Sequence, residues 1–263
     1  MRIVLSSLLI LVLSISFISG FLVSPSNVNA TQTELSSLGF HGKLPDFSTY
    51  TDVKQKKEDF FAYLLPRVKH ANDNILKERQ RLFILQSSLP NLTRNETAEL
   101  IELKEKYEVK LSNHDDIINE LIKRIDIIPA SLALAQAANE SAWGTSRFAE
   151  QGNNLFGQWC YVEGCGMIPS GRNDTQRHEV AKFDSVLASI ESYMRNLNSQ
   201  HAYEKLRTLR AQARADEDII SGVKLARGLW SYSIRREAYV DEIQLMIKQN
   251  QLHQYNRPLP SHP

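Results

Sequence analysis

The residues best suited to chemistry lie together in the segment Ala135-Gln-Ala-Ala-Asn-Glu140-Ser-Ala-Trp-Gly144. Glu140 comes at the end of a short alanine-rich stretch that is typical of a buried helix, and Trp143 follows almost at once. Apolar surroundings disfavour an ionised carboxylate and raise its pKa, so such a group can carry a proton near neutral pH. An indole also offers a flat apolar face on which a sugar ring can stack. The segment predicts a general acid at Glu140, and the alternative is a surface Glu at a helix end beside a core Trp.

The segment continues into Asn153-Asn-Leu-Phe-Gly157. A Glu-Ser-x-Trp-Gly followed by an Asn-Leu-Phe-Gly resembles the signature of the glucosaminidase family of bacterial cell-wall hydrolases, the flagellar-muramidase and autolysin type. Pro129-Ala-Ser-Leu and Phe183-Asp-Ser-Val186 resemble its Bax-like branch. The resemblance spans roughly residues 50–249. It implies a mainly α (α+β), lysozyme-like fold with a small β-hairpin lobe, and the role of general acid for Glu140.

The resemblance also implies further site residues. The family's second carboxylate lies on a strand before an aromatic residue, which corresponds here to Glu179, with Glu163, Asp174 or the substrate's own N-acetyl group as alternatives. A solvated strand Glu is the structural alternative for Glu179. The family's Tyr-Ala-Thr-Asp-Pro-x-Tyr segment is one residue longer here, from Tyr232 to Tyr239, and lacks Asp-Pro. Tyr232 is expected to orient an N-acetyl group or the intermediate. Substrate contacts are expected, with core packing as the alternative, at Trp143, Phe156, Trp159 and Tyr239.

The activity implied is that of an endo-β-N-acetylglucosaminidase on the glycan strands of peptidoglycan. A lytic transglycosylase, or a catalytically silent peptidoglycan-binding or scaffolding protein, is an alternative. Lys and Arg number 31 and Asp and Glu 30, a net charge of +1, so the chain has no electrostatic footprint for nucleic acid. Phosphate-binding loops, zinc-protease motifs and nucleophile elbows are absent from the sequence. We therefore expect no cofactor and no metal, and a monomer.

The N-terminus resembles a secretory signal. Arg2 precedes an uncharged run from Ile3 to Val23, and Val28-Asn-Ala30 offers small residues at the positions that a signal peptidase reads. Cleavage would make Thr31 the new N-terminus and the protein periplasmic or secreted, without stable membrane insertion. The run is also long enough for an uncleaved inner-membrane anchor, which is the alternative.

The two cysteines, Cys160 and Cys165, are close in sequence. In an exported protein such a pair predicts a disulfide that closes a small loop. A metal site is the alternative, for which His178 is the one further ligand nearby in sequence.

Helical periodicity dominates the chain before Glu140. We expect a signal at 1–30, a linker at 31–52 and a helical hairpin at 53–124. Pro66 predicts a kink or break in the first arm, and Thr93 with Glu96 predicts a capping box in the second. The apolar stripe of the first arm consists of Phe61, Leu64, Val68, Ala71, Ile75, Leu82 and Leu85.

The site residues fall in the second half of the chain. We expect a glucosaminidase domain at 125–249 and a disordered tail at 250–263. The first helix of the glucosaminidase domain is expected to start near Pro129 and to end by Gly144. Residues 159–183 are expected to form the β lobe, with a strand at 179–183. Further helices are expected at 185–198 (capped by Asp184), 204–214, 222–229 and 238–248.

Overall fold

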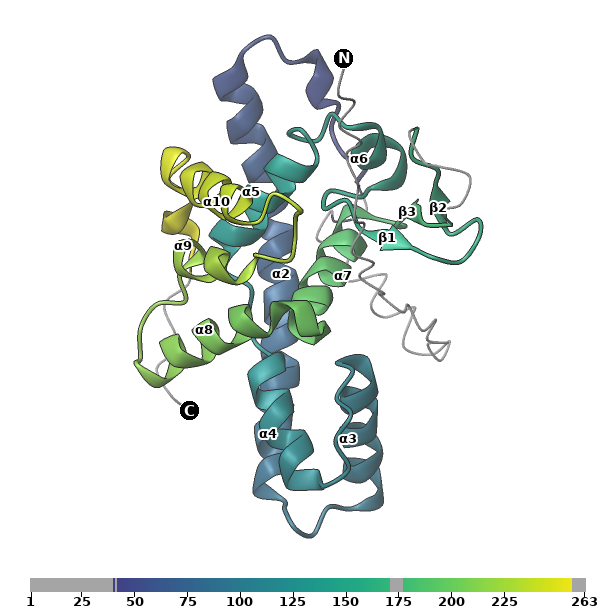
Figure 1. Ribbon diagram of the computed structural model, residues 1–263, viewed down its shortest axis with the longest axis vertical. Helices are drawn as coiled ribbons and strands as arrows, with labels where there is room; N and C mark the ends of the chain where they lie inside the picture. Colours follow the sequence, from purple (N-terminus) through teal and green to yellow (C-terminus); the bar gives the residue numbers. More distant parts are fainter. Residues whose placement is uncertain (1–39, 41, 171–176, 257–263) are drawn as a thin grey trace, which may run out of the picture.

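The computed structural model describes residue 40, residues 42–170 and residues 177–256. Its α-helices are α2 (Val53–Ser87), α3 (Arg94–Lys106), α4 (His114–Arg124), α5 (Ala130–Glu140), α6 (Arg147–Gly152), α7 (Val186–Ser199), α8 (Glu204–Ala215), α9 (Gly222–Leu225) and α10 (Glu237–Gln249). The 3-10 turns are η1 (Phe47–Thr49), η2 (His201–Tyr203), η3 (Ala226–Gly228) and η4 (Leu252–Tyr255), and the strands are β1 (Trp159–Cys160), β2 (Gly166–Met167) and β3 (Glu179–Ala181). The predicted class, mainly helical with a small β lobe, is confirmed (Figure 1). None of the helices among the described residues has the length and apolar character needed to cross a bilayer.

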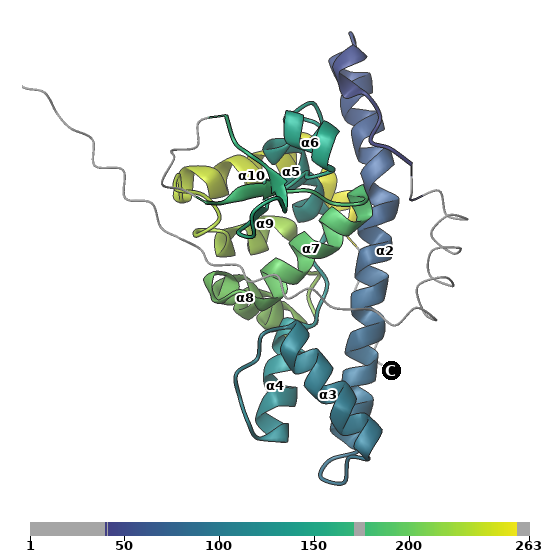
Figure 2. The same cartoon turned by 90° about the vertical axis from the view of Figure 1, so that its right-hand side faces the viewer.

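Helix α2 runs along most of the length of the molecule (Figure 2). Every residue of the predicted apolar stripe is buried on it, from Phe61 to Leu85. The predicted break at Pro66 is wrong, because the helix continues through it. Proline removes one backbone donor, and the carbonyl that loses its partner belongs to Ala62. Both residues lie on the exposed side of the helix, where water can satisfy that carbonyl, while the buried side packs against α5 and α7.

The second arm of the hairpin is two helices, α3 and α4, that lie beside the lower part of α2 (Figure 1). The capping box of Thr93 and Glu96 is confirmed at the start of α3. The interruption follows Tyr107, where Glu108 takes a φ of 56°, and Asn113 caps the new helix through its side chain. The hydrophobic core of α2 and α4 is continuous with that of α5 and α7, and the division into a separate hairpin and catalytic domain stays a prediction.

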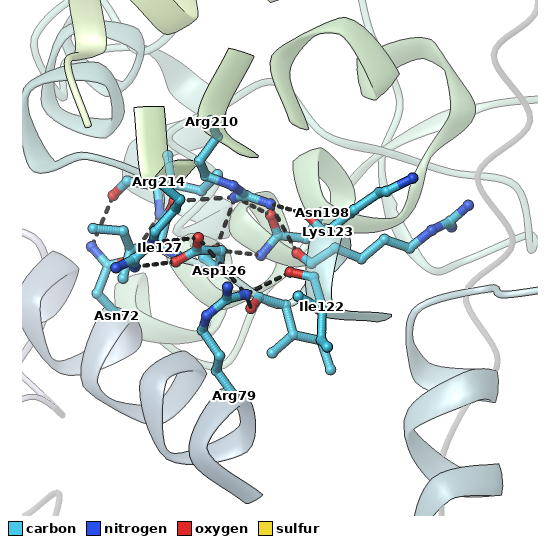
Figure 3. Close-up of polar contacts among 12 residues, drawn as sticks. Asn72, Arg79, Ile122, Lys123, Asp126, Ile127, Asn198, Arg210 and Arg214 are labelled. Carbon is cyan, nitrogen blue, oxygen red and sulfur yellow. Dashed lines mark hydrogen bonds and ion pairs between the residues drawn. The ribbon is translucent and has the colours of Figure 1, made fainter. Parts of the chain in front are cut away.

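A buried ion cluster joins α2, α4 and α8 (Figure 3). Asp126, in the link between α4 and α5, is 2% exposed and contacts Arg214 at 2.6 Å and Arg79 at 3.8 Å. Arg79 and Arg210 also donate to the last carbonyls of α4, which carry the negative end of its dipole. Burial raises the pKa of Asp126, but the bond from Arg214 and the charges of Arg210 and Arg79 outweigh it and hold the pKa below its usual value.

Helix α5 lies at the centre and packs against α2, α9, α10 and η4. Residues 130–138 of this helix are all buried, and their many alanines allow the neighbouring helices to approach closely. Pro129 immediately precedes the helix as its N-cap residue. The helix ends at Glu140, so the central helix carries the predicted acid to the edge of the core.

The predicted linker and the predicted disordered tail both contribute to this core. In the predicted linker, Phe47 begins η1 and is 1% exposed. In the predicted tail, Leu252 is fully buried, and the side chain of Asn256 accepts a hydrogen bond from the Ser131 amide at the start of α5. The predicted disorder is therefore wrong for 250–256, and the predicted linker packs on the core over 42–52. Phe47 and Leu252 are the buried anchors, and Leu44, Tyr50 and Tyr255 pack beside them. The signal at 1–30 and residues 257–263 lie outside the described residues.

The β lobe is a three-stranded antiparallel sheet of order β1-β3-β2 and not a simple hairpin. Helix α6, which the sequence did not predict, connects the loop after Glu140 to this sheet. Helix α7 follows it, capped by the side chain of Ser185 and not by the predicted Asp184. The three strands lie between α6 and α7 in the chain, and the sheet packs beside α6, on the side of the molecule where α5 ends (Figure 1).

Candidate active site

The carboxyl group of Glu140 lies at the C-terminal end of α5, where the core meets solvent. Its Oε1 accepts a hydrogen bond of 2.7 Å from the Tyr239 hydroxyl on α10 and a longer one of 3.4 Å from Asn139. Burial raises the pKa of Glu140, the two hydrogen bonds oppose that effect, and the net direction is upward. The structure thus gives Glu140 the elevated pKa that the sequence predicted for an acid.

A chain of buried hydrogen bonds continues behind Glu140. Tyr239 accepts a 2.9 Å hydrogen bond from Nε2 of Gln136, which lies one helical turn before Glu140 on α5. Oε1 of Gln136 in turn accepts a 2.6 Å bond from the hydroxyl of Tyr193 on α7. Gln136 is fully buried and Tyr193 is 1% exposed, so three helices meet through polar groups that satisfy one another.

Two aromatic stacks hold this chain in place. Tyr239 stacks on Tyr232 with ring centroids 5.4 Å apart, and Tyr193 stacks on Phe156 at 3.9 Å. The hydroxyl of Tyr232 donates to the backbone oxygen of Phe156 at 2.9 Å, and this bond connects the two stacks. The Tyr that contacts the acid is therefore Tyr239, and the predicted role of Tyr232 in orienting the substrate stays a prediction.

The exposure of each aromatic ring determines whether a sugar could stack on it. Phe156 is 3% exposed and Tyr239 is 2% exposed. Rings covered in this way leave no open face for a sugar to stack on, since Phe156 packs in the core and Tyr239 reaches Glu140 through its hydroxyl. Substrate contact at these two residues stays a prediction. Trp159, at the start of β1, is partly exposed, and His178 stacks on one of its faces at 4.1 Å.

The turn after Glu140 has an unusual backbone. Ala142, Trp143 and Gly144 have successive φ values of 51°, 61° and 80°. Non-glycine residues pay for left-handed φ values, and such turns persist where the surroundings determine them. The hydroxyl of Ser141 donates to the Ala137 carbonyl and accepts from the Gly144 amide, which fixes the turn directly after the acid.

The start of α2 and the segment before it support the same turn. Phe60 and Phe61 make edge-to-face contacts with Trp143, with ring centroids 5.7 and 5.3 Å apart, and the ammonium of Lys57 lies 4.9 Å from the centre of the Trp143 ring. Phe47 packs so closely on Gly144 that a Cβ there would lie 2.7 Å from its ring. Trp143 therefore packs on α2, and its predicted role as a sugar platform stays a prediction.

The β lobe contains the predicted second carboxylate and the disulfide. The disulfide between Cys160 and Cys165 is confirmed, so neither sulfur is a thiolate available to a metal. Glu179 is 5% exposed, which rules out the solvated alternative, and its two oxygens accept from the amides of Gly164 and Gly166 at 3.1 and 2.8 Å. Glu179 thus shapes the disulfide loop, and a catalytic role for it stays a prediction. Of the other candidates, Glu163 is exposed and Asp174 lies outside the described residues.

The sequence reasoning missed Gln136 and Tyr193. A signal for Gln136 was present, because it is a polar residue one turn from Glu140 in an otherwise apolar helix, and residues four apart share a helix face. Tyr193 had no such signal, since α7 has a normal amphipathic pattern. The sequence reasoning also missed the ion pair between Arg235 and Glu242, at 2.8 Å. The charge of Glu242 raises the pKa of Glu140, and the charge of Arg235 lowers it.

A carboxyl group of raised pKa at the end of a central helix, beside a small β lobe, is the arrangement of a glycosidase-type enzyme. A sequence model described as mannosyl-glycoprotein endo-beta-N-acetylglucosaminidase matches residues 115–252, just over half of the chain. The chain belongs to this glucosaminidase family.

Two individual proteins are similar to this chain. The protein bax of Escherichia coli (strain K12) is 32% identical over 210 residues, which cover 79% of this chain and 74% of that protein. The crystal structure of the catalytic domain of the autolysin Auto from Listeria monocytogenes matches at 16% identity with a TM-score of 0.41, over 90% of this chain and 100% of that one. The expected family is confirmed.

Proposed function

We propose that this protein is an exported endo-β-N-acetylglucosaminidase that hydrolyses the glycan strands of peptidoglycan, with Glu140 as the general acid. The observation that carries the proposal is the environment of Glu140, where burial raises its pKa while Tyr239 supplies a hydrogen bond at 2.7 Å. Membership of the glucosaminidase family supports peptidoglycan as the substrate.

Protonated Glu140 would donate its proton to the oxygen of the leaving sugar as the glycosidic bond breaks. This step needs an acid that is still protonated at the working pH, which the raised pKa provides. The carboxylate that results would be stabilised by the hydroxyl of Tyr239, which is already in place as a donor. The hydrogen bond therefore becomes stronger as negative charge develops on Glu140.

The second catalytic role, that of the nucleophile, has two candidates, Glu179 and the N-acetyl group of the substrate. Two backbone amides already bind the carboxylate of Glu179, which favours its structural role in the disulfide loop. In substrate-assisted hydrolysis the N-acetyl group attacks the anomeric carbon and forms a cyclic oxazolinium, which water then opens, so no second carboxylate is needed as nucleophile. We propose this route. A thiazoline derivative of N-acetylglucosamine, a stable mimic of that ring, should inhibit competitively; no inhibition, together with rescue of Glu179→Ala by azide, would restore the two-carboxylate scheme.

Export is the remaining part of the proposal. The residues that support it are the uncharged run from Ile3 to Val23 and the small residues of Val28-Asn-Ala30. The disulfide of Cys160 and Cys165 agrees with an oxidising compartment. Mass spectrometry of the protein from a periplasmic fraction should give a chain that begins at Thr31. An intact chain in the membrane pellet would contradict cleavage.

The reaction type is tested by the chemical ends of the products. Purified sacculi are digested with the mature protein, and the fragments are identified by mass spectrometry. Hydrolysis by a glucosaminidase leaves reducing N-acetylglucosamine ends. Anhydro-muramic ends would instead identify a lytic transglycosylase, and binding to sacculi without any product would identify a catalytically silent wall-binding protein.

A further inference from the structure

The two oxygens of the Glu140 carboxyl group are not equivalent. Tyr239 and Asn139 both donate to Oε1, at 2.7 and 3.4 Å. Among the described residues, Oε2 of Glu140 receives no hydrogen bond. When the carboxyl group is neutral, its proton therefore belongs on Oε2, because Oε1 is occupied as an acceptor.

The donor role of Tyr239 follows from the residue behind it. A phenol has a single proton, so a tyrosine that accepts a bond from one neighbour can give that proton to another. Nε2 of Gln136 donates to Tyr239, which leaves the Tyr239 proton free for Glu140. The direction of the bond to the acid is thus set by the amide of Gln136.

The orientation of that amide is set in turn by Tyr193. Oε1 of Gln136 accepts the proton of Tyr193 at 2.6 Å, so its Nε2 is the end that faces Tyr239. Reversing the amide would make Tyr239 a donor to Gln136 and would remove its proton from Glu140. An ionised carboxylate favours the observed direction, because a hydrogen bond to a charged oxygen is about twice as strong as a neutral one.

The surrounding rings leave little freedom for a different arrangement. Tyr193 lies flat on Phe156, with an angle of 7° between the rings, and Tyr239 lies flat on Tyr232, with an angle of 6°. Gln136 is fully buried on the central helix. The hydroxyl and amide groups that form this chain of hydrogen bonds therefore stay at fixed positions. Only the direction in which each group donates its proton could change.

We infer that Gln136 and Tyr193 are positioning residues that fix Tyr239 as a donor to Oε1 of Glu140 and thereby keep the acidic proton on Oε2. The inference rests on the proposed function, in which Glu140 is the acid. It assigns a task to two residues that touch neither substrate nor the reacting atoms. The proton that passes to the leaving group then departs from Oε2, and the Tyr239 bond to Oε1 needs no rearrangement.

Other ionisable groups also act on Glu140 and must be considered in any pH experiment. Glu242 and Arg235, at α10 and in the loop before it, form an ion pair near the acid. The phenols of the site interact with the Glu140 charge as well, and their pKa values are raised, mainly by burial. Within the described part of the chain, the ionisable groups that interact with Glu140 include Arg235, Glu242, Tyr193, Tyr203, Tyr232 and Tyr239.

The test is the pH dependence of kcat/KM for Gln136→Met. Methionine has nearly the same volume as glutamine but lacks the Nε2 donor, so Tyr239 is no longer obliged to give its proton to Glu140. The carboxylate then loses stabilisation, its pKa rises, and the acid stays protonated to higher pH. We expect the alkaline limb of the profile to move to higher pH, and the maximal rate to fall about tenfold because the proton is no longer confined to one oxygen.

Gln244→Met is the matched control. Gln244, on α10, also donates one hydrogen bond from its amide, to the backbone of Val223 at 2.8 Å, and among the described residues it bonds neither to Glu140 nor to Tyr239. The control should keep the wild-type profile. Tyr193→Phe provides a second variant if Gln136→Met fails to fold: it removes the proton that orients the amide and should shift the profile in the same direction.

The outcomes separate this inference from the proposed function. An unshifted alkaline limb in folded Gln136→Met or, where that variant does not fold, in Tyr193→Phe would overturn the inference, whether the maximal rate falls or not, since a merely structural defect lowers the rate at all pH values. A folded Glu140→Gln variant with full activity would instead overturn the role of Glu140, and the inference would fall with it. Inactive Glu140→Gln together with unshifted profiles would leave the acid intact and remove only the positioning role.

Discussion

Gly144→Ala tests whether packing from the start of α2 and the segment before it holds the turn that follows Glu140. Gly144 has a φ of +80°, and an added Cβ would lie 2.7 Å from Cδ2 of Phe47 and 3.3 Å from Cε2 of Phe60. The left-handed φ alone costs an alanine about 1–2 kcal/mol. Forcing a methyl group into a filled site costs about 1–3 kcal/mol more. The free energy of unfolding should therefore fall by roughly 2–5 kcal/mol.

Gly164→Ala separates the two contributions. Gly164 has nearly the same φ, +79°, but an added Cβ there has no neighbour within 4 Å. This control should lose about 1–2 kcal/mol only, so the difference between the two variants measures the clash with Phe47 and Phe60. Urea unfolding gives both values. The Gly144 variant should also lose turnover out of proportion to its stability, because a shifted turn moves Glu140.

A double-mutant cycle with Phe47→Leu sharpens the test. The smaller side chain makes room for the methyl group, so Gly144→Ala should cost less in the Phe47→Leu background than in the wild type. Equal losses of stability for Gly144→Ala and Gly164→Ala, with no coupling to Phe47, would refute the claim that the aromatic residues of 47–61 determine the turn.

Three further predictions concern buried carboxylates. Asp126→Asn should lower the free energy of unfolding in urea by about 3–5 kcal/mol, because three arginines lose their counter-ion; a loss below about 1 kcal/mol would contradict this. The pKa of Asp126 is lowered on folding, so its stabilising effect is complete above the unfolded pKa, about 3.9, and is lost as pH falls through the lower folded value. Below about pH 4, the free energy of unfolding of the wild type should accordingly fall more steeply with decreasing pH than that of Asp126→Asn. Parallel curves would argue against this effect. Glu179→Gln should speed hydrogen exchange at the amides of Gly164 and Gly166, measured by NMR, since these donate to the carboxylate; unchanged protection would show that those bonds contribute little.

The sequence predicted the parts of the fold that depend on local periodicity. The spacing of Phe61, Val68 and the other apolar residues of α2 predicted a buried face, and all of them are buried. The same reasoning failed where a segment has no periodic pattern. Phe47 lies among polar residues and Leu252 follows a helix end, so neither forms a pattern, although each is buried and anchors its segment.

The site was predictable to the extent that its chemistry is local. Glu140 could be predicted because the alanine-rich helix, the Trp and the helix end are adjacent in sequence. The choice between Tyr232 and Tyr239 could not, since it depends on where α10 begins and on Arg236, whose φ of 49° turns the chain just before that helix. The Asp126 cluster was likewise hidden, because Asp126 lies more than 40 residues from Arg79 and more than 80 from Arg210 and Arg214. A charged residue on a helix also normally indicates solvent.

The central claim is that Glu140 is the acid of a glucosaminidase, and one measurement tests it most directly. Mature wild type and Glu140→Gln are incubated with purified sacculi at matched concentration, after far-UV circular dichroism and thermal unfolding have shown that both are folded. The account predicts reducing N-acetylglucosamine ends from wild type and none above background from the variant. Equal release of those ends by folded Glu140→Gln would contradict it.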